Sequence, residues 1–429
     1  MSTGICRSPS RWSVAARVAG LLALAACATG PPSPAPAAAR PGALRVGTTL
    51  DYAPFSFREG GDPQGFDVDL VRRFAADQGL PLTLVPVTWP GLVPGLVGGA
   101  YDVALGGVTV RPDRSLAGRF TAPVAESGAV VLVPAASPLR AESDLERQGL
   151  RLAVNAGGHL ETVARARFPA ADIHALSDNT AVPEELVRGT ADAVLTDSVE
   201  ALRWQHALPP TRALGPLTRD RKAWLVASGE RELARTLDAW LLAREADGSL
   251  AAERERWLGD GAAAPTATPL AVLVAAIDER LSLMPWVAEA KARRSQPVTD
   301  AAQEARVLEA GRGAVAAAAV REGRPAPSPA SVDALFSSLI VAATEVERAR
   351  LDAGPAPAVD GPDLDGALRP AIARSSERVA EALVALDAPV DAGTARAATQ
   401  DGVRSVALSP TTLDRIADAI AACARGAVP

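Results

Sequence analysis

The pattern of strands and helices changes once along the chain, near residue 260, and this change constrains the fold most. Apolar strand segments such as LRVGTTL (44–50) and LPLTLVPV (80–87) flank an amphipathic helix pattern, GFDVDLVRRFAADQG (65–79). Strand and helix patterns alternate up to ADAVLTD (191–197), which predicts an α/β fold with a largely parallel sheet. Because the pattern restarts at SGAVVLVPA (127–135), we expect two lobes with a cleft between them.

No strand pattern follows the segment GDGAAAPTAT (259–268), which is small and polar and is predicted to be a linker. The rest of the chain is predicted to be all-helical, with helices at 269–292, 300–321, 330–353, 365–388 and 410–425. The sequence therefore predicts a two-lobed α/β unit at 44–258 and an all-α unit at 269–427.

The N-terminal segment has the pattern of an export signal. Arginines precede the apolar run VAGLLALAA (18–26), which is too short to span a bilayer but suits a signal-peptide core. The run ends in LAAC, which resembles the lipobox of bacterial lipoproteins, whose cysteine (here Cys27) is lipidated; the alternative is an ordinary signal with a chance cysteine. Residues 1–27 are predicted to be the signal and 28–43 a Pro/Ala-rich tether. We therefore expect an exported, periplasmic protein that meets the membrane only through a lipid on Cys27.

Charge and cysteine content exclude several classes of function. The net charge is −6 and no basic stripe occurs, so we expect no nucleic-acid partner. The chain has three cysteines, of which Cys6 and Cys27 belong to the signal and Cys423 stands alone, so no disulfide framework is predicted. The three histidines lack metal-ligand spacing, and we expect neither a metal nor another cofactor.

Several segments of the first unit carry a likeness to a known family: VGTTLDYAPFSF, GFDVDLVRRFA, the Trp89-Pro90 pair, YDVALGGVTVRPDR and GTADAVLTD. They resemble the periplasmic amino-acid-binding proteins, which implies a two-lobed α/β fold of the type II kind. The resemblance also implies that Arg114 clamps a ligand carboxylate, a planar anion that matches the planar guanidinium fork. The residues alone allow Arg114 to be a solvated loop arginine.

A closer likeness lies in SFREGG, VTWPGL, VNAGGHLE, SDNTAV, LTDSVEA and KAWLV. These segments resemble the exported cyclohexadienyl dehydratases, which convert prephenate to phenylpyruvate or arogenate to phenylalanine. The resemblance implies that Glu200 is the general acid. It implies a substrate-binding set of Asp51, Trp89, Thr109, Arg114, Asp197 and Lys222.

The chemistry of the reaction explains why a buried glutamate is needed. Prephenate loses CO₂ and its ring hydroxyl together, and a carboxylic acid that a dry pocket keeps protonated can donate the proton that the leaving group requires. The residues alone allow Glu200 to be an acid at a helix start and Lys222 to be a surface lysine. The chain also departs from the dehydratases at His159-Leu160, where the family has threonine and asparagine.

Three segments of the second unit also carry a likeness: RLSLMPWVAEAKARRSQPVTDAAQEARVLE, ALFSSLIVAATEVERAR and PDLDGALRPAIARSSER. They resemble the helical chorismate mutases, most closely the exported (gamma) class, which rearrange chorismate to prephenate. Arg280 and Lys291 are eleven residues apart, which places them on one face of a continuous helix. The resemblance implies that both face the dicarboxylate substrate.

The same resemblance assigns further roles in the second unit. Arg280 and Arg369 take the positions that clamp carboxylates, and Lys291 takes that of the lysine at the carboxylate and ether oxygen. Glu304 stands where a glutamate meets the ring hydroxyl, and Glu347 stands beside the ether oxygen, where it must be protonated. Gln303 replaces a common arginine and is counted with the substrate-binding residues. The spacing of Asp300 and Gln303 also fits a capping box, and Pro370 predicts that Arg369 starts a helix.

The product of the second predicted activity is the substrate of the first. We therefore expect a bifunctional enzyme that converts chorismate through prephenate to phenylpyruvate, with arogenate as another substrate and a homodimer as the predicted assembly. One alternative is an active mutase fused to a non-catalytic amino-acid-binding domain. Another is a transport receptor with a degenerate helical appendage.

Overall fold

The computed structural model describes residues 42–259, 266–354 and 361–426. The predicted signal with Cys27, most of the tether and most of the linker at 259–268 lie outside the described residues.

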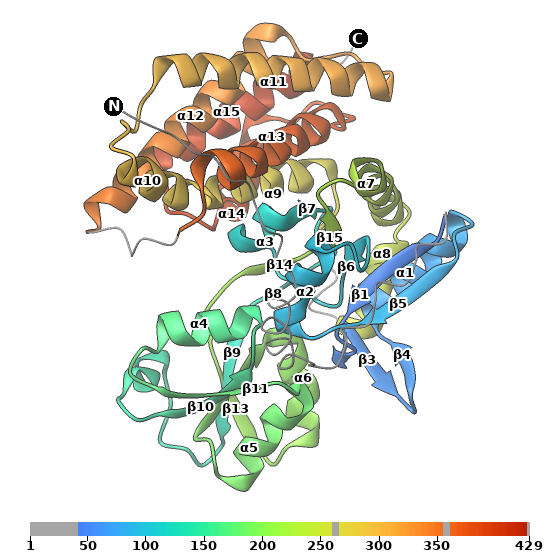
Figure 1. The fold of residues 1–429 in the computed structure, drawn as a ribbon, viewed down its shortest axis with the longest axis vertical. Helices are drawn as coiled ribbons and strands as arrows, with labels where there is room; N and C mark the ends of the chain where they lie inside the picture. The colour runs from blue at the N-terminus through green and yellow to red at the C-terminus, as the bar shows by residue number, and fades with distance from the viewer. Residues whose placement is uncertain (1–41, 260–265, 355–360, 427–429) are drawn as a thin grey trace, which may run out of the picture. The chain divides into compact units, whose positions relative to one another are not determined.

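The first lobe is built on a five-stranded mixed sheet (Figure 1). Its strands, in the order β5-β1-β6-β15-β7, are Leu82–Pro86, Leu44–Thr48, Val103–Ala104, Leu225–Ala227 and Gly118–Phe120. β1 pairs in parallel with β5 and β6, whereas β15 runs antiparallel to β6 and β7. The helices of this lobe are α1 (Phe66–Asp77), α2 (Trp89–Val97) and α3 (Pro112–Ala117), followed later in the chain by α7 (Arg231–Ala246) and α8 (Ser249–Leu258). A small sheet of β2 (Asp51–Tyr52), β3 (Ser56–Glu59) and β4 (Asp62–Gln64) lies beside them.

The second lobe has its own five-stranded sheet. Its strands, in the order β11-β10-β12-β9-β13, are Asp172–Leu176, Arg151–Asn155, Ala193–Asp197, Ala129–Pro134 and Thr211–Leu214. β10 is parallel to β11 and β12, and β9 is antiparallel to β12 and β13. The helices of this lobe are α4 (His159–Arg167), α5 (Val182–Arg188) and α6 (Ser198–Ala207). The alternation of strand and helix follows the predicted order, and the α/β two-lobed fold is confirmed.

Two short strands join the lobes. The chain leaves the first sheet through β8 (Ala125–Ser127) and returns to it through β14 (Asp220–Lys222). These strands pair antiparallel, with Arg221 opposite Glu126. We call β8 and β14 the hinge strands, because any movement of one lobe against the other must pass through them.

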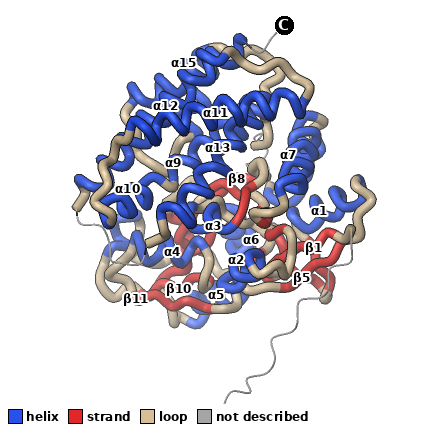
Figure 2. Tube along the Cα trace, turned by 45° about the horizontal axis from the view of Figure 1, so that its top comes forward, coloured by secondary structure: helices blue, strands red, loops and turns tan. Residues whose placement is uncertain are grey.

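The remaining described residues form an all-helical region, as predicted (Figure 2). Its helices are α9 (Pro269–Ser282), α10 (Met284–Arg293), α11 (Ala301–Glu322), α12 (Pro329–Asp352), α13 (Arg369–Val384), α14 (Ala392–Gly402) and α15 (Pro410–Gly426). A π-helical turn at Leu364–Leu368 leads into α13, which begins at Arg369 as the following proline predicted.

Two predictions for this region were wrong. The helix expected at 269–292 is broken into α9 and α10, because Pro285 has no amide hydrogen and its ring clashes with the carbonyl four residues earlier. Helix α14 was not predicted, since its sequence, AGTARAATQDG, has no apolar side chain larger than alanine to reveal a buried face.

The helical region and the first lobe share a hydrophobic core. One cluster of buried side chains extends from Val46, Phe66 and Trp224 in the first lobe to Leu273 and Leu339 in the helices. The second lobe has two separate clusters of its own. The helices are therefore joined to the first lobe by packing as well as by the chain.

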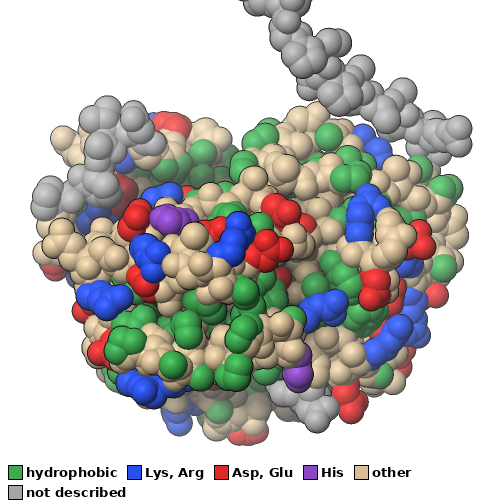
Figure 3. All heavy atoms as spheres, turned by 90° about the horizontal axis from the view of Figure 1, so that it is seen from below, with side chains coloured by type: hydrophobic (Ala, Val, Ile, Leu, Met, Phe, Trp, Pro, Cys, Tyr) green, Lys and Arg blue, Asp and Glu red, His purple; other side chains and the backbone are tan. Residues whose placement is uncertain are grey.

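Acidic and basic side chains are interspersed on the face of the molecule drawn in Figure 3. No extended patch of one sign is visible on that face. This arrangement agrees with the absence of a basic stripe in the sequence.

Candidate active sites

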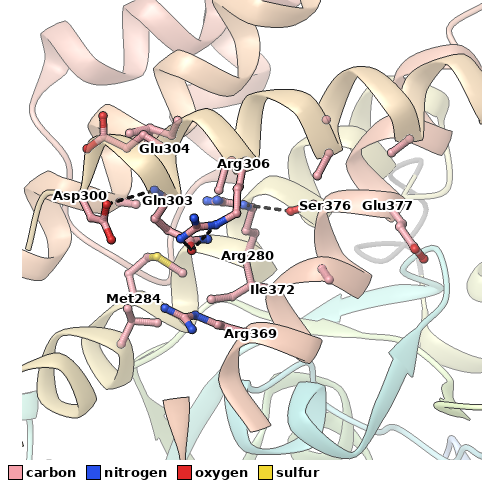
Figure 4. A pocket seen from close by; sticks show the side chains of 18 of the residues that line it. Arg280, Met284, Asp300, Gln303, Glu304, Arg306, Arg369, Ile372, Ser376 and Glu377 are labelled. Carbon is pink, nitrogen blue, oxygen red and sulfur yellow. Dashed lines mark hydrogen bonds between the residues drawn. The ribbon is translucent and has the colours of Figure 1, made fainter. Parts of the chain in front are cut away.

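The helical region encloses a cavity of about 590 Å³, a size typical of small-molecule sites. Side chains from α9 to α13 line it, and all six positions predicted for the mutase are among them: Arg280, Lys291, Gln303, Glu304, Glu347 and Arg369. Figure 4 shows Arg280, Arg306 and Arg369 facing the same space, with Glu377 at the far end. Although Arg280 and Lys291 lie on two helices rather than one, both reach this cavity.

Arg280 is the most deeply buried cation of this cavity, with 3% of its surface exposed. Its Nε donates to Ser376 Oγ at 3.2 Å, while Nη1 is buried without a hydrogen-bonding partner among the described residues. Burial lowers the pKa of Arg280 to about 10, so the side chain remains charged at neutral pH. A buried guanidinium with unused donors favours an anionic ligand, because an unpaired buried charge is costly.

Lys291 and Glu347 form a partly buried pair at the wall of the same cavity. Lys291 Nζ lies 2.8 Å from Glu347 Oε2 and also donates to the carbonyl oxygen of Val298 at 2.7 Å. Burial raises the pKa of Glu347, and the nearby Lys291 and Arg280 act in the opposite direction. A dianionic ligand would weaken that opposing effect and favour the protonated acid further.

Arg306 lines the cavity but was not predicted. Asp300 caps α11 through the backbone N–H groups of Ala302 and Gln303, but Gln303 does not complete a capping box. Instead, Gln303 Oε1 accepts from Arg306 Nη2 at 2.8 Å and from Nε at 3.2 Å. Arg306 therefore places a cation at the cavity, next to the position where the resemblance led us to expect an arginine.

Arg369 and Glu304 lie toward the more open part of the cavity. Arg369 is half-exposed and pairs with Asp365 in the preceding turn. Glu304 stands on the first turn of α11 and is half-buried. Arg378, nine residues after Arg369, is buried away from the cavity and pairs with Glu279.

A second, much smaller cavity of about 20 Å³ lies between the two lobes. Its lining comes from both lobes and from a hinge strand: Tyr52, Trp89, Gly107, Thr109, Arg114, Asn155, Gly158, His159, Leu160, Asn179 and Lys222. A ring-containing ligand needs several hundred Å³. The lobes must therefore separate, or their side chains must move, before such a ligand enters.

Arg114 projects into this cavity from α3. It is 3% exposed, so the alternative of a solvated arginine is wrong. Its Nη1 donates to the carbonyl oxygen of Thr109 at 2.8 Å, and its guanidinium lies 5.7 Å from the centre of the Trp89 ring. Burial lowers the pKa of Arg114 to about 9, and no ion pair to it is found among the described residues. The charge is available to a ligand carboxylate.

Asp197 connects the strand β12 to the helix α6 and faces the hinge. One carboxylate oxygen caps α6 by accepting from the backbone N–H groups of Val199 and Glu200. The other lies 3.2 Å from Lys222 Nζ and accepts from the hydroxyl of Tyr52. Lys222 is fully buried and also donates to Thr109 Oγ1 at 3.0 Å, so it is not a surface lysine.

Glu200 lies behind the wall of the cavity, 1% exposed and on the first turn of α6. Asn179, which lines the cavity, donates to Glu200 Oε1 at 2.7 Å, and Thr196 donates to Oε2 at 2.7 Å. Burial and the neighbouring Asp197 raise the pKa of Glu200 well above its usual value. The raised pKa favours the protonated form, which is the form that a general acid requires.

The predicted role of Asp51 is not matched by its position, because Asp51 does not line the cavity. Its backbone oxygen accepts from Asn179 Nδ2 at 3.2 Å, and burial raises the pKa of its carboxyl. The next residue, Tyr52, lines the cavity instead and forms a T-shaped ring pair with Trp89. Successive side chains of a strand point to opposite faces, which explains why Tyr52 of β2 lines the cavity and its neighbour Asp51 does not.

His159 and Leu160, where the sequence departs from the dehydratases, both line the cavity. His159 Nε2 lies 3.0 Å from Asp220 Oδ2, on the hinge strand β14. Burial lowers the pKa of His159, although Asp220 acts in the opposite direction. The departure from the dehydratases therefore changes the lining of this cavity.

Comparison with known proteins shows which family the first half of the chain resembles. Residues 44–260 match the bacterial extracellular solute-binding proteins, family 3. The chain belongs to this family. Cyclohexadienyl dehydratase of Pseudomonas aeruginosa is 34% identical over 224 residues, which cover 51% of this chain and 83% of that protein. The L-cystine-binding protein of Escherichia coli is 26% identical over 221 residues, 51% of this chain and 83% of that protein.

A solved structure also resembles the solute-binding half. It is an ancestral amino acid-binding protein described as a precursor of cyclohexadienyl dehydratase, with 31% sequence identity and a TM-score of 0.48. The likeness covers 51% of this chain and 96% of that one.

Sequence reasoning missed Tyr52, Asn179 and Arg306. Tyr52 stands within a segment that carried the solute-binding resemblance, and Asn179 stands within one that carried the dehydratase resemblance. Arg306 is revealed only by its helical spacing from Gln303. Among the described residues, no group of three or more His, Cys, Asp or Glu side chains could hold a metal ion.

Proposed function

We propose that this chain is a bifunctional enzyme of the cell exterior. The helical region converts chorismate to prephenate, and the solute-binding domain converts prephenate to phenylpyruvate. The observation that carries the proposal is that each cavity has a buried arginine in its lining and a buried carboxyl group of raised pKa in or directly behind its wall. Both substrates are dicarboxylates. The dehydration needs an acid to protonate its leaving group, and the rearrangement is favoured by a hydrogen-bond donor at the ether oxygen.

The first reaction is a pericyclic rearrangement that needs no nucleophile. The enzyme must hold both carboxylates so that the side chain folds over the ring, and it must stabilise negative charge on the ether oxygen as that bond breaks. Arg280 and Arg369 are suited to the two carboxylates, with Arg306 as a further cation beside Gln303. Lys291 and protonated Glu347 are suited to the ether oxygen.

The mutase activity should fall as pH rises. Glu347 must carry a proton to donate to the ether oxygen, and its pKa is raised, so the active form is lost as pH passes through that raised value. We expect Glu347→Gln, which keeps a donor without a titrating proton, to flatten the profile of kcat/KM measured between about pH 5 and pH 9. Glu322→Gln, an exposed change at the end of α11, is the control. A Glu347→Gln profile with the wild-type slope would contradict the role of Glu347.

The second reaction would use Glu200 as the acid. Its proton passes to the ring hydroxyl, the C–O bond breaks and water leaves. The electrons of the bond to the ring carboxylate complete the aromatic ring, and CO₂ leaves. Asn179 stands between Glu200 and the cavity, so the substrate must displace its amide to reach the acid. Solvent then returns the proton to Glu200.

The solute-binding domain also has a feature that favours the enzyme over an amino-acid receptor. By resemblance, a receptor of this family uses an aspartate in the position of Asp197 to hold the ligand's ammonium group. Here Lys222 already lies 3.2 Å from that carboxylate and neutralises it from within the protein. The dehydratase relative at 34% identity supports the same assignment.

The competing proposal is a mutase fused to a domain that only binds an amino acid. It is favoured by His159 and Leu160 at the cavity and by relatives such as the L-cystine-binding protein. Export is supported by the family, which is described as extracellular. Lipidation of Cys27 and a homodimer remain predictions.

Product analysis separates these functions. Residues 31–429 would be supplied with chorismate, and the products would be identified after extraction without acid, because acid aromatises prephenate. We expect phenylpyruvate to accumulate. Prephenate as the final product would instead support the binding-domain proposal, and unchanged chorismate would refute the mutase.

A further inference from the structure

The helical region is anchored to the hinge strands as well as to the first lobe. Arg221 on β14 pairs with Asp278 on α9 at 2.7 Å, and both side chains are buried. Arg221 also donates to the carbonyl oxygen of Gly402. On the other hinge strand, Glu126 contacts Arg404, so both hinge strands are held from the same side.

Asp278 is the centre of this contact. Its Oδ1 accepts from the backbone N–H of Arg404 at 2.9 Å, and from the backbone N–H and hydroxyl of Ser405 at 2.8 and 2.7 Å. Its Oδ2 accepts a hydrogen bond from Arg221 Nη1 at 2.7 Å. One buried carboxylate therefore fixes the segment after α14 and the hinge strand β14 together.

The second lobe is not held in this way. In the parts of the chain that the structure describes, hydrogen bonds and ion pairs join the helical region to the first lobe and the hinge, and none joins it to residues 128–217. The contacts to the first lobe include Ser115 with Glu279, the carbonyl oxygen of Thr121 with Arg378, and Arg119 with Glu377. The second lobe can therefore move without breaking a polar contact to the helices, and its movement acts on β14 and β8.

The same two elements also reach both cavities. On β14, Lys222 lines the small cavity and Asp220 meets His159 there, while Arg221 between them points to α9. On α9, Asp278 meets the hinge, whereas Arg280 lines the large cavity. Residues two apart on a helix lie on nearly opposite sides, so α9 stands between the hinge and the large cavity.

We propose that α9 couples the two cavities through the Asp278–Arg221 pair. Asp278 is a positioning residue for the hinge strand that carries Lys222 and Asp220. A ligand that holds Arg280 fixes α9, and this lowers the cost of ordering the hinge when the lobes close on a second ligand. Coupling of this kind is reciprocal, so each ligand tightens binding of the other by the same factor. The inference rests on the proposed function for the identity of the two ligands.

Calorimetry with two unreactive probes tests the coupling. The probes are phenylpyruvate for the small cavity and, for the large cavity, a bicyclic ether dicarboxylate shaped like the transition state of the rearrangement. We expect phenylpyruvate to bind about fivefold more tightly when the dicarboxylate is present. Asp278→Asn should abolish this factor. The exposed and milder Glu126→Gln, which removes the pair to Arg404 and leaves Asp278 with Arg221, should reduce it only in part. Asp333→Asn, which removes an exposed pair to Arg312, should retain it.

The outcomes separate this inference from the proposed function. A coupling factor of one in the wild-type chain, with both probes bound, would overturn the coupling and leave the two activities intact. Failure of either probe to bind would count against the proposed function. The hinge then remains testable by amide hydrogen exchange of residues 124–128 and 218–223. Faster exchange in Asp278→Asn than in Asp333→Asn supports the positioning role, and equal exchange refutes it.

Discussion

Replacing Arg280 by alanine should lower kcat/KM for chorismate by about 1,000-fold, which corresponds to about 4 kcal/mol of transition-state stabilisation. The guanidinium is buried, has unused donors and is preorganised by Ser376, so its interaction with a carboxylate is not weakened by solvent. The measurement is the initial rate of chorismate loss at a mildly acidic pH. Arg280→Lys should recover only a small part of the rate, because an ammonium cannot form the two parallel hydrogen bonds of the fork.

The chain contains its own control for this prediction. Prephenate supplied directly should still be converted to phenylpyruvate by Arg280→Ala, because the dehydratase reaction belongs to the other cavity. Arg312→Ala changes an exposed arginine of α11 and should leave both rates unchanged. A mutase rate within tenfold of wild type in Arg280→Ala would remove Arg280 from the site.

The sequence predicted those parts of the fold that depend on local patterns. The strand and helix order of the two lobes follows from apolar periodicity, and the start of α13 at Arg369 follows from Pro370. The break between α9 and α10 could have been predicted in the same way from Pro285. Helix α14 could not, because alanine supports a helix without marking which face is buried.

The parts of the site that the sequence did not predict depend on tertiary structure. Lys222 and Asp197 are far apart in the chain and meet only because β14 crosses between the lobes. Asn179 reaches Glu200 from a different element of the second lobe. The buried pair of Arg221 and Asp278 joins a hinge strand to a helix, and nothing in either local sequence distinguishes these charges from solvated ones. The resemblance to known families identified single residues, but it did not give their partners.

Glu200→Gln should lower the dehydratase rate by between about 100-fold and 10,000-fold, the range expected for loss of a general acid. Glutamine keeps the size of the side chain and can still bond to Asn179 and Thr196, but it has no proton to give. With chorismate as the substrate, prephenate should accumulate where the wild-type chain forms phenylpyruvate. Glu184→Gln, an exposed change in α5, is the matched control and should form phenylpyruvate at the wild-type rate.

The same variant should change how stability depends on pH, which separates a protonated Glu200 from an ionised one. The folded-state pKa of Glu200 lies well above its unfolded value, so folding takes up a proton between the two. Below the unfolded pKa of about 4.3 the burial of this group carries no ionisation penalty, and the penalty grows as pH rises toward the folded pKa. Glu200→Gln lacks this penalty, so its Tm should fall less than that of the wild-type chain between about pH 5 and pH 8. Parallel Tm curves would mean that Glu200 is already ionised in the folded state, and it could not then be the acid.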